Sequence, residues 1–244
     1  MKTRLIRCLS VGVMLVANSG LAQELPVPDS LYVATRCHVN DGATFQEAVE
    51  EGRSRQNAND GPNQIFYRQP IAGNDAAPNQ FTRVVSWDNM QHWASSGGPS
   101  GSQTMTCDNQ NRRFLTTRNI GNNRTAYSGS SDRSSLVSTR QCTLTTGATI
   151  SDAYQFLTEI QTSREVQGDT SQMQLSHLFL GPSIETEMRS RIIVRLIGEL
   201  AVGLARTFDS VNEGNVAIGT PARGSTQHCQ DPTLTRSYMI LQNN

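Results

Sequence analysis

The sequence contains almost no lysine: Lys2 is the only one in 244 residues, and every other basic residue is arginine. Aromatic residues are also scarce, at 6% of the chain. Without residues 1–22, 18 basic and 21 acidic residues remain, because that segment holds three basic residues and no acidic one. The resulting formal charge of −3 leaves no basic footprint for nucleic acid, so we expect no nucleic-acid partner.

Long apolar runs are missing beyond the first 22 residues. The best candidate, residues 192–204, is interrupted by Arg195 and Glu199. A helix that crosses a bilayer needs about 20 predominantly apolar residues. We therefore expect no transmembrane anchor in the mature protein.

The familiar motifs of active sites are also absent. None of the four histidines belongs to a His-x-x-x-His or His-Glu-x-x-His pattern, so we expect no metal site. There is no Gly-x-Ser-x-Gly elbow, and the glycine-rich segment 97–101 contains a proline and precedes no strong helix, which argues against a phosphate-binding loop. We expect no bound cofactor, and the sequence identifies no catalytic residue.

The first 22 residues have the pattern of a secretory signal peptide. Basic residues come first, residues 9–17 form a short apolar core, and the small residues 19–22 suit cleavage after Ala22. Cys8 lies before the apolar core and not at the cleavage point, so we do not expect it to carry a lipid. The sequence predicts an exported bacterial protein, either periplasmic or secreted.

Two segments 105 residues apart are similar. Residues 36–44 read RCHVNDGAT and residues 141–149 read QCTLTTGAT, each with a cysteine five residues before Gly-Ala-Thr. A second pair follows in the same order, GSQTMTC at 101–107 and GSTQHC at 224–229. Two ordered landmarks, each with a cysteine, indicate a duplicated domain. We predict a first repeat over 23–119, a linker over 120–135 and a second repeat over 136–244.

Four cysteines remain after the signal peptide, and an even number in an exported chain suggests disulfides. Of the three possible pairings, the duplication selects Cys37 with Cys107 and Cys142 with Cys229. The cysteines of each pair are 70 or 87 residues apart, unlike a redox-active Cys-x-x-Cys pair. We interpret both bridges as structural, each stabilising the fold by about 4 kcal/mol in the chain-entropy model.

Each repeat shows the order strand, helix, strand, strand, helix, strand. In the first repeat we predict strands over 31–39, 64–72, 81–87 and 105–116, with helices over 44–56 and 88–95. In the second repeat we predict strands over 136–144, 173–180, 191–197 and 233–241, with helices over 150–160 and 199–208. The first helix begins with a capping box formed by Thr44 and Glu47. This order is that of a ferredoxin-like unit, in which strand four lies beside strand one and brings the paired cysteines close.

The predicted fold class is α+β, with two tandem ferredoxin-like units packed as a pseudo-dimeric barrel and one disulfide in each unit. The element order and the duplication resemble the dimeric α+β barrel superfamily, which includes small monooxygenases of the antibiotic-biosynthesis type and stress-response barrel proteins. In that superfamily two ferredoxin-like units pack sheet against sheet. The resemblance implies a monomer built as a pseudo-dimer around a shared interior.

One cluster of aromatic and polar residues stands out after the third predicted strand. Residues 87–93 read WDNMQHW, which contains both tryptophans of the chain, while the matching residues 197–202 of the second repeat are largely apolar. Such asymmetry after duplication favours a site kept in one copy, although two tryptophans packed in a core explain the same pattern. We assign a candidate ligand site to Trp87, His92 and Trp93, with Tyr67 and Arg68 from the adjacent predicted strand.

These observations favour an exported, non-enzymatic protein that binds a small hydrophobic ligand or a protein partner. The first alternative is a cofactor-independent enzyme of the small barrel monooxygenase or isomerase kind, using Trp87, His92 and Asp88. The second alternative is a structural envelope protein with a filled interior. A cavity with Arg68 and His92 pointing inward supports ligand binding or catalysis, whereas a dry, packed interior supports the structural role.

Overall fold

The computed structural model describes residues 24–55, 60–73, 77–96, 101–128, 130, 132–181, 190–212 and 226–243. The predicted signal peptide, residues 1–22, lies outside these ranges. Within them, no helix is both long and apolar enough to span a membrane.

Strands and helices alternate along the chain. The first half forms β1 (Ser30–Val39), α1 (Phe45–Ser54), β2 (Gln64–Ala72), β3 (Gln80–Trp87), α2 (Met90–Ser95), β4 (Met105–Cys107), the 3-10 turn η1 (Asn109–Asn111) and β5 (Arg113–Ile120). The second half forms β6 (Ser134–Leu144), α3 (Ile150–Val166), β7 (Gln172–Leu180), β8 (Arg191–Ile197), α4 (Ala201–Asn212), β9 (Gln227–Cys229) and β10 (Thr233–Gln242). Most predicted elements are therefore confirmed to within a few residues.

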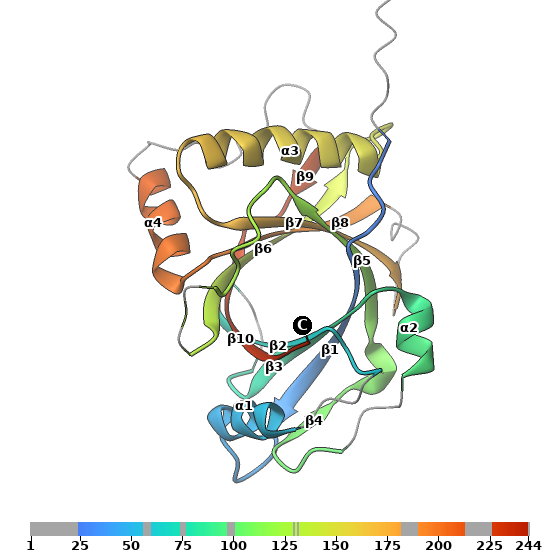
Figure 1. Ribbon diagram of the computed structural model, residues 1–244, viewed down its shortest axis with the longest axis vertical. Coiled ribbons are helices and arrows are strands. Elements are labelled where there is room, and N and C mark those ends of the chain that lie inside the picture. Colours follow the sequence, from blue (N-terminus) through green and yellow to red (C-terminus); the bar gives the residue numbers. More distant parts are fainter. Residues whose placement is uncertain are drawn as a thin grey trace, which may run out of the picture.

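The eight long strands close into one antiparallel barrel. Hydrogen-bonded neighbours follow the order β10-β2-β3-β1-β5-β7-β8-β6, and β6 pairs again with β10 to complete the ring. The short strands β4 and β9 lie beside β1 and β6. Figure 1 looks down the barrel, with helices α1–α4 outside the ring.

The predicted fold class is wrong. The chain is mostly β and forms a single closed eight-stranded barrel, not two ferredoxin-like α+β units packed sheet against sheet, so the resemblance to the dimeric α+β barrel superfamily fails with it. The reason lies at the sheet edges: β5 pairs with β7 and β10 pairs with β2, so strands from the two halves share backbone hydrogen bonds. Closure pairs the N–H and C=O groups that an open edge leaves exposed.

The two halves of the chain have matching strand orders. The first half contributes β2-β3-β1-β5 and the second half contributes β7-β8-β6-β10, with each strand at the matching place. The predicted capping box is confirmed, since Thr44 N–H donates to Glu47 Oε2 at 2.7 Å and Glu47 N–H donates to Thr44 Oγ1 at 3.2 Å. Thr149 and Asp152 form the same motif at the start of α3. The predicted repeat boundaries stay a prediction.

The single strand predicted over 105–116 is interrupted in the structure. Asp108 caps the short turn η1 between β4 and β5, accepting a hydrogen bond from Asn111 N–H at 3.3 Å. The break allows β4 to pair with the end of β1 while β5 pairs with its beginning. One predicted strand thus makes two separate contacts with the same neighbour.

Both predicted disulfides are confirmed. Cys37 on β1 lies directly opposite Cys107 on β4, with 4.0 Å between the Cα atoms. Cys142 on β6 lies directly opposite Cys229 on β9, at 3.9 Å. Directly opposed residues of an antiparallel pair have Cα atoms about 4.5–5.5 Å apart, so the strand pairing itself brings the two cysteines close enough to bond. Both bridges lie near the ends of β1 and β6, at the same end of the barrel.

Alternation along the strands separates an inner from an outer face. The inner cluster takes one side chain from nearly every barrel strand: Tyr32, Phe66, Val84, Leu115, Val137, Ile197 and Met239, together with Tyr127 from the β5–β6 connection. Three other apolar clusters lie on the outer face. The inner cluster fills only part of the barrel, which leaves room at one end.

Candidate functional site

A cavity of about 360 Å³ opens at the barrel end opposite the disulfides. Its mouth lies where β1, β2 and β7 begin and where β3, β5, β8 and β10 end. Polar side chains surround this mouth: Asp29, Asn63, Asn119, Gln172, Gln242 and Asn243. Deeper in the cavity the lining residues include Phe66, Arg68, Tyr127, Ile197 and Met239. The cavity is therefore a polar entrance above a partly apolar floor that contains one cation.

Tyr127 reaches the floor from the connection between β5 and β6. Its phenol donates a hydrogen bond to Ser237 Oγ at 2.7 Å, and its ring stacks on Phe66 with 5.2 Å between ring centroids. Its backbone has a φ of 66°, a left-handed conformation that costs a bulky residue roughly 1–3 kcal/mol. Burial raises the pKa of Tyr127, so the phenol keeps its proton at neutral pH. The fold thus accepts a strained backbone at the point where this side chain enters the barrel.

Arg68 lies on β2 and is only 6% exposed. Its guanidinium lies 5.9 Å from the centre of the Phe66 ring and interacts with the Tyr127 side chain. Two of its nitrogens, Nε and Nη2, are buried and have no hydrogen-bond partner in the described part of the chain. Unpaired buried donors are costly, and those of a charged group are especially so.

A second buried guanidinium, that of Arg195, lies behind the floor. Arg195 is 4% exposed, donates a hydrogen bond to Ser176 Oγ and lies 6.0 Å from the centre of the Tyr32 ring. Burial, and next the charge of Arg68, lower the pKa of Arg195 to about 9. It therefore remains protonated at neutral pH, and the barrel interior carries two neighbouring positive charges.

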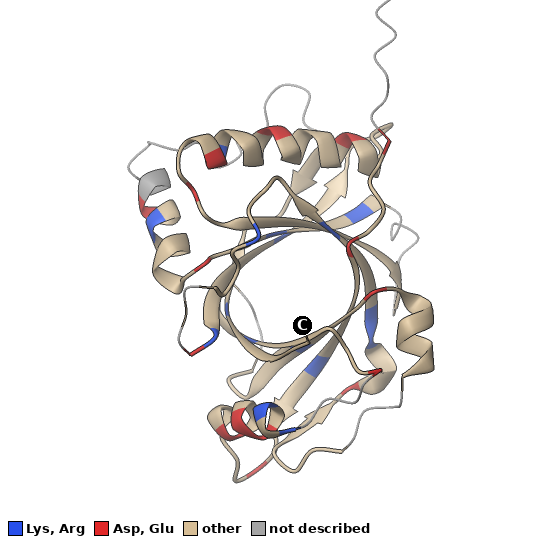
Figure 2. Cartoon of the chain, viewed as in Figure 1, with Lys and Arg blue, Asp and Glu red and all other residues tan. Residues whose placement is uncertain are grey.

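Negative charge is absent from the barrel wall. None of the strands β1–β10 contains Asp or Glu, and no ion pair joins Arg68 or Arg195 to an acidic side chain among the described residues. In Figure 2 the acidic positions, in red, lie on helices and loops, whereas the charged positions on the strands are blue. Asp29, at the mouth, already accepts a hydrogen bond from Asn119 N–H at 2.7 Å. The positive charge inside the barrel is uncompensated by the described protein groups.

No protein-family model matches the chain, and no curated protein is significantly similar to it in sequence. Within the described residues, no three or more His, Cys, Asp and Glu side chains are grouped to hold a metal ion.

The five predicted site residues do not lie in one place. Arg68 lines the cavity, but Trp87 packs on the outer face of β3 with Leu31, Val33 and Phe114. His92 and Trp93, both on α2, cover that outer cluster. His92 packs edge-on against Trp87 at 5.1 Å between ring centroids, and Trp93 packs edge-on against Phe114 at 4.9 Å. Tyr67 points outward and lies beneath α1. Its phenol oxygen is so close to Gly52 that a Cβ atom added at that glycine would lie 2.9 Å from it.

The sequence reasoning missed the inward-facing polar residues. Tyr127 falls in the segment predicted as a linker, and Arg195 counted only as an interruption of an apolar run. Gln174 and Ser176 also face inward on β7, at 4% and 0% exposure. The available signal was the alternation of polar with apolar residues along the first five residues of β7, QMQLS, which in a barrel indicates a polar interior as readily as a polar exterior.

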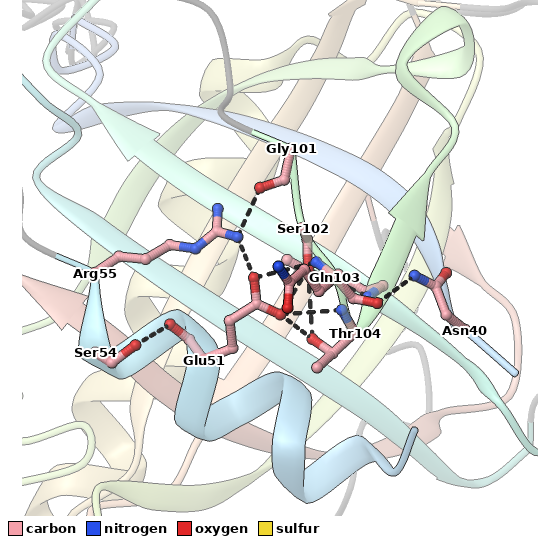
Figure 3. Close-up of polar contacts among 9 residues, drawn as sticks. Asn40, Glu51, Ser54, Arg55, Gly101, Ser102, Gln103 and Thr104 are labelled. Atoms are coloured by element: carbon pink, nitrogen blue, oxygen red, sulfur yellow. Dashed lines mark hydrogen bonds and ion pairs between the residues drawn. The ribbon is translucent and has the colours of Figure 1, made fainter. Parts of the chain in front are cut away.

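A separate polar cluster forms outside the barrel around Glu51 on α1. Its carboxylate accepts hydrogen bonds from Ser102 Oγ at 3.0 Å, from Thr104 N–H at 3.0 Å and from the Thr104 hydroxyl, and it pairs with Arg55 (Figure 3). Arg55 also donates to Gly101 C=O at 2.8 Å. Burial acts to raise the pKa of Glu51, but these hydrogen bonds prevail and lower it to about 2. Because its acceptors are occupied, we interpret this cluster as an anchor between α1 and the segment leading into β4.

Proposed function

We propose that this protein is an exported, non-enzymatic carrier or sensor that binds one small molecule inside its barrel. The cavity is the observation that supports this. Its volume of about 360 Å³ falls in the range of small-molecule sites, roughly 300–1,000 Å³. An eight-stranded barrel is just wide enough to be filled by side chains or to hold one small ligand.

Export is the second part of the proposal. Disulfides persist mainly in oxidising compartments such as the periplasm or the extracellular space. The two bridges, Cys37–Cys107 and Cys142–Cys229, together with the signal-like residues 1–22, favour such a location.

The lining favours a polar ligand over the hydrophobic one expected from the sequence. Amide side chains such as Asn119, Gln172 and Gln174 line the same cavity as Arg68, while apolar groups are fewer. The amides bond to one another, but Gln174 Oε1 and two Arg68 nitrogens have no partner among the described residues, so a ligand with hydrogen-bonding groups can satisfy atoms that a purely apolar one would leave unpaired.

The same lining favours binding over catalysis. Among the described residues that line the cavity there is no His or Cys, and Asp29 at the mouth is the only carboxylate. The residues of the enzymatic alternative, Trp87, His92 and Asp88, lie outside the barrel wall: Nδ1 of His92 is 3.0 Å from Asp88 Oδ2, and its ring packs on Trp87. The structural alternative requires a filled interior, which the open cavity does not support.

Blocking the mouth tests the proposal. Ala126 lines the cavity, is only partly buried and packs against the inner cluster, so Ala126→Trp should fill the entrance above that cluster. We expect native mass spectrometry of the exported wild-type protein to show a bound small molecule that is absent from Ala126→Trp. Ala126→Ser is the matched control and should retain it.

Two-dimensional NMR of the protein with a panel of small neutral and anionic compounds is a second test of the proposal. Binding compounds should shift the amide resonances of cavity residues such as Asn119 and Gln242 in the wild-type protein, and not in Ala126→Trp. The proposal is overturned if the wild-type protein carries no bound molecule and no compound in the panel shifts these resonances.

A further inference from the structure

We infer that the ligand carries a carboxylate, which the Nε and Nη2 donors of Arg68 bind in a bidentate pair at the floor of the cavity. This inference rests on the proposed function, because it names the chemical class of the molecule that the barrel holds. It is carried by a different observation, the unpaired donors of a buried cation.

The geometry of the two unpaired nitrogens selects the partner. Nε–H and Nη2–H lie on the same edge of the guanidinium and point in parallel, so they match the two oxygens of a carboxylate. The guanidinium lies near the Tyr127 phenol and 5.9 Å from the centre of the Phe66 ring, and neither group pairs with Nε or Nη2. The edge that carries these two donors is therefore the one a carboxylate would bind.

The electrostatics favour an anion in the same place. Arg68 and Arg195 are both more than nine-tenths buried, they repel each other, and no acidic side chain among the described residues pairs with either. An anion that reaches Arg68 relieves this repulsion in a low-dielectric interior, where the attraction between opposite charges is strong. Arg124 at the mouth adds a third cation along the path.

The ligand must displace part of the floor to reach Arg68, since neighbouring side chains cover both nitrogens. Met239, which lines the cavity on the neighbouring strand β10, is the side chain suited to move. Its unbranched thioether turns easily and breaks no hydrogen bond when it does so.

A second unpaired atom, Oε1 of Gln174, indicates which group the ligand carries besides its carboxylate. Gln174 donates to the Tyr32 hydroxyl at 3.1 Å and to Asn119 Oδ1 at 3.0 Å, but its Oε1 is a buried acceptor without a partner among the described residues. Gln174 lines the same cavity as Arg68. A ligand that carries a hydroxyl or amino donor as well as its carboxylate could bond to both residues, so we expect hydroxy acids or amino acids to bind more tightly than plain carboxylic acids.

Five small probes separate these two features: acetate, glycolate, acetamide, glycolamide and, as an anion without a carboxylate, sulfate, each titrated to 100 mM at constant chloride. The readout is the ¹⁵N NMR signal of each arginine Nε–H. We expect saturable shifts of the Arg68 signal with acetate, several-fold tighter binding of glycolate, and no saturable shift with either amide. Arg118 is the internal control, because it is equally buried but outside the cavity, with its Nε donating to Pro26 C=O at 2.6 Å.

Variants at Arg68 give the second measurement. Arg68→Met should weaken glycolate binding by about 10- to 100-fold, as expected for the loss of hydrogen bonds to a charged group. Arg68→Lys should lie between Met and the wild type, because lysine keeps the charge but not the planar fork. Arg118→Met, the matched control, should leave glycolate binding unchanged.

The melting temperature distinguishes a binding role from a structural one. If Arg68 serves the ligand, Arg68→Met removes an unpaired buried charge and should leave the melting temperature of the ligand-free protein unchanged or higher. A clear drop in melting temperature together with unchanged glycolate binding would show that Arg68 is structural and would overturn the inference.

Two outcomes separate this inference from the function it rests on. If the amides bind as tightly as the acids, or if sulfate shifts the Arg68 signal as strongly as acetate does, the carboxylate assignment is wrong while ligand binding in the barrel stands. If the wild-type protein carries no bound molecule and none of the probes shifts any cavity resonance, both proposals fail.

Discussion

The two halves of the barrel share a scaffold but differ in what they point inward. Each half has a disulfide between its first barrel strand and a short added strand, and a capping box at the start of its first helix. The strand registers match inward positions between the halves: Phe66 and Val84 correspond to Gln174 and Arg195, and Arg68 corresponds to Ser176. Backbone-determining features have thus stayed alike while the interior has diverged.

The difference gives the barrel interior two kinds of side chain at matching positions. At these positions the first half has Phe66, Val84 and the cation Arg68, whereas the second half has Gln174, Ser176 and the cation Arg195. Ser176 even accepts the hydrogen bond of Arg195, so the position that holds the cation in one half supports the cation in the other. A symmetrical pair of halves would lack this combination.

Removing the disulfides tests whether the two halves depend equally on them for stability. Of the changes considered, this one should lower the free energy of unfolding most. Replacing both cysteines of a pair by alanine should lower the free energy of unfolding by about 4 kcal/mol for either bridge. The loops of 70 and 87 residues imply a difference between the two variants of only about 0.2 kcal/mol. Urea unfolding of both double variants measures this, and a difference above 1 kcal/mol would mean that one half depends more on its bridge.

The Glu51 anchor belongs to the first half of the chain. Its removal should cause the next largest loss in the free energy of unfolding. Its carboxylate has a pKa lowered from 4.5 to about 2, so its stabilisation is present above about pH 4.5 and is lost as the pH falls towards 2. Glu51→Gln should cost about 1–2 kcal/mol at pH 7, since solvent screens this partly exposed carboxylate, and little at pH 2, as measured by thermal unfolding across that range.

Glu165 on α3 is the comparison for Glu51 in the second half. It accepts hydrogen bonds from Asn122 N–H at 2.7 Å and Asn123 N–H at 3.0 Å, but no arginine pairs with it among the described residues. Glu165→Gln should therefore cost less than Glu51→Gln. Equal losses would contradict the assignment of Glu51 as the stronger anchor.

Replacing Arg195 tests the difference between the inward-facing residues of the two halves. Of the changes considered, it should alter the free energy of unfolding least. Arg195→Met makes the second half resemble Val84 of the first half and removes an unpaired buried charge, so we expect a gain of about 1 kcal/mol at pH 7. Ser176 keeps its contact with Thr117, whose hydroxyl lies 2.8 Å away.

The pH dependence of that gain has a definite sign. Because the folded pKa of Arg195 is lowered to about 9, the unfolded chain binds more protons above that pH, and this residue destabilises the wild type less as the pH rises. The advantage of Arg195→Met should therefore shrink above pH 9. A variant that is less stable than the wild type at pH 7 would show that the contacts of Arg195 with Ser176 and Tyr32 outweigh its burial.

The sequence predicted the local elements because those depend on short-range patterns, and it predicted the disulfides because each cysteine lies in a short segment that occurs twice in the same order. The capping box at Thr44 and the repeated Cys…Gly-Ala-Thr segments are local signals that survive any change of neighbours. The fold class was wrong because it depends on which edges meet. Nothing in the residues of β5 or β7 taken singly reveals that these strands pair across the two halves.

The candidate site could be predicted only in part, for a similar reason. Arg68 was named from its place beside an aromatic cluster, yet that cluster lies on the outer face of the barrel, because Trp87 and Arg68 are on opposite sides of the wall. Tyr127 could not be foreseen, since a connecting segment rich in Asn, Ser and Gly gives no periodic signal that it sends a side chain into a core.

The placement of the two sulfur–sulfur bonds has a consequence for motion. Both disulfides lie at the barrel end opposite the mouth of the cavity. Covalent cross-links therefore restrain only that end, whereas hydrogen bonds and packing hold the rim of the mouth. Slow-exchanging amides should therefore concentrate near the disulfides, and amides at the rim should exchange sooner. Local opening should therefore be easier at the rim of the cavity than at the disulfide-bonded end.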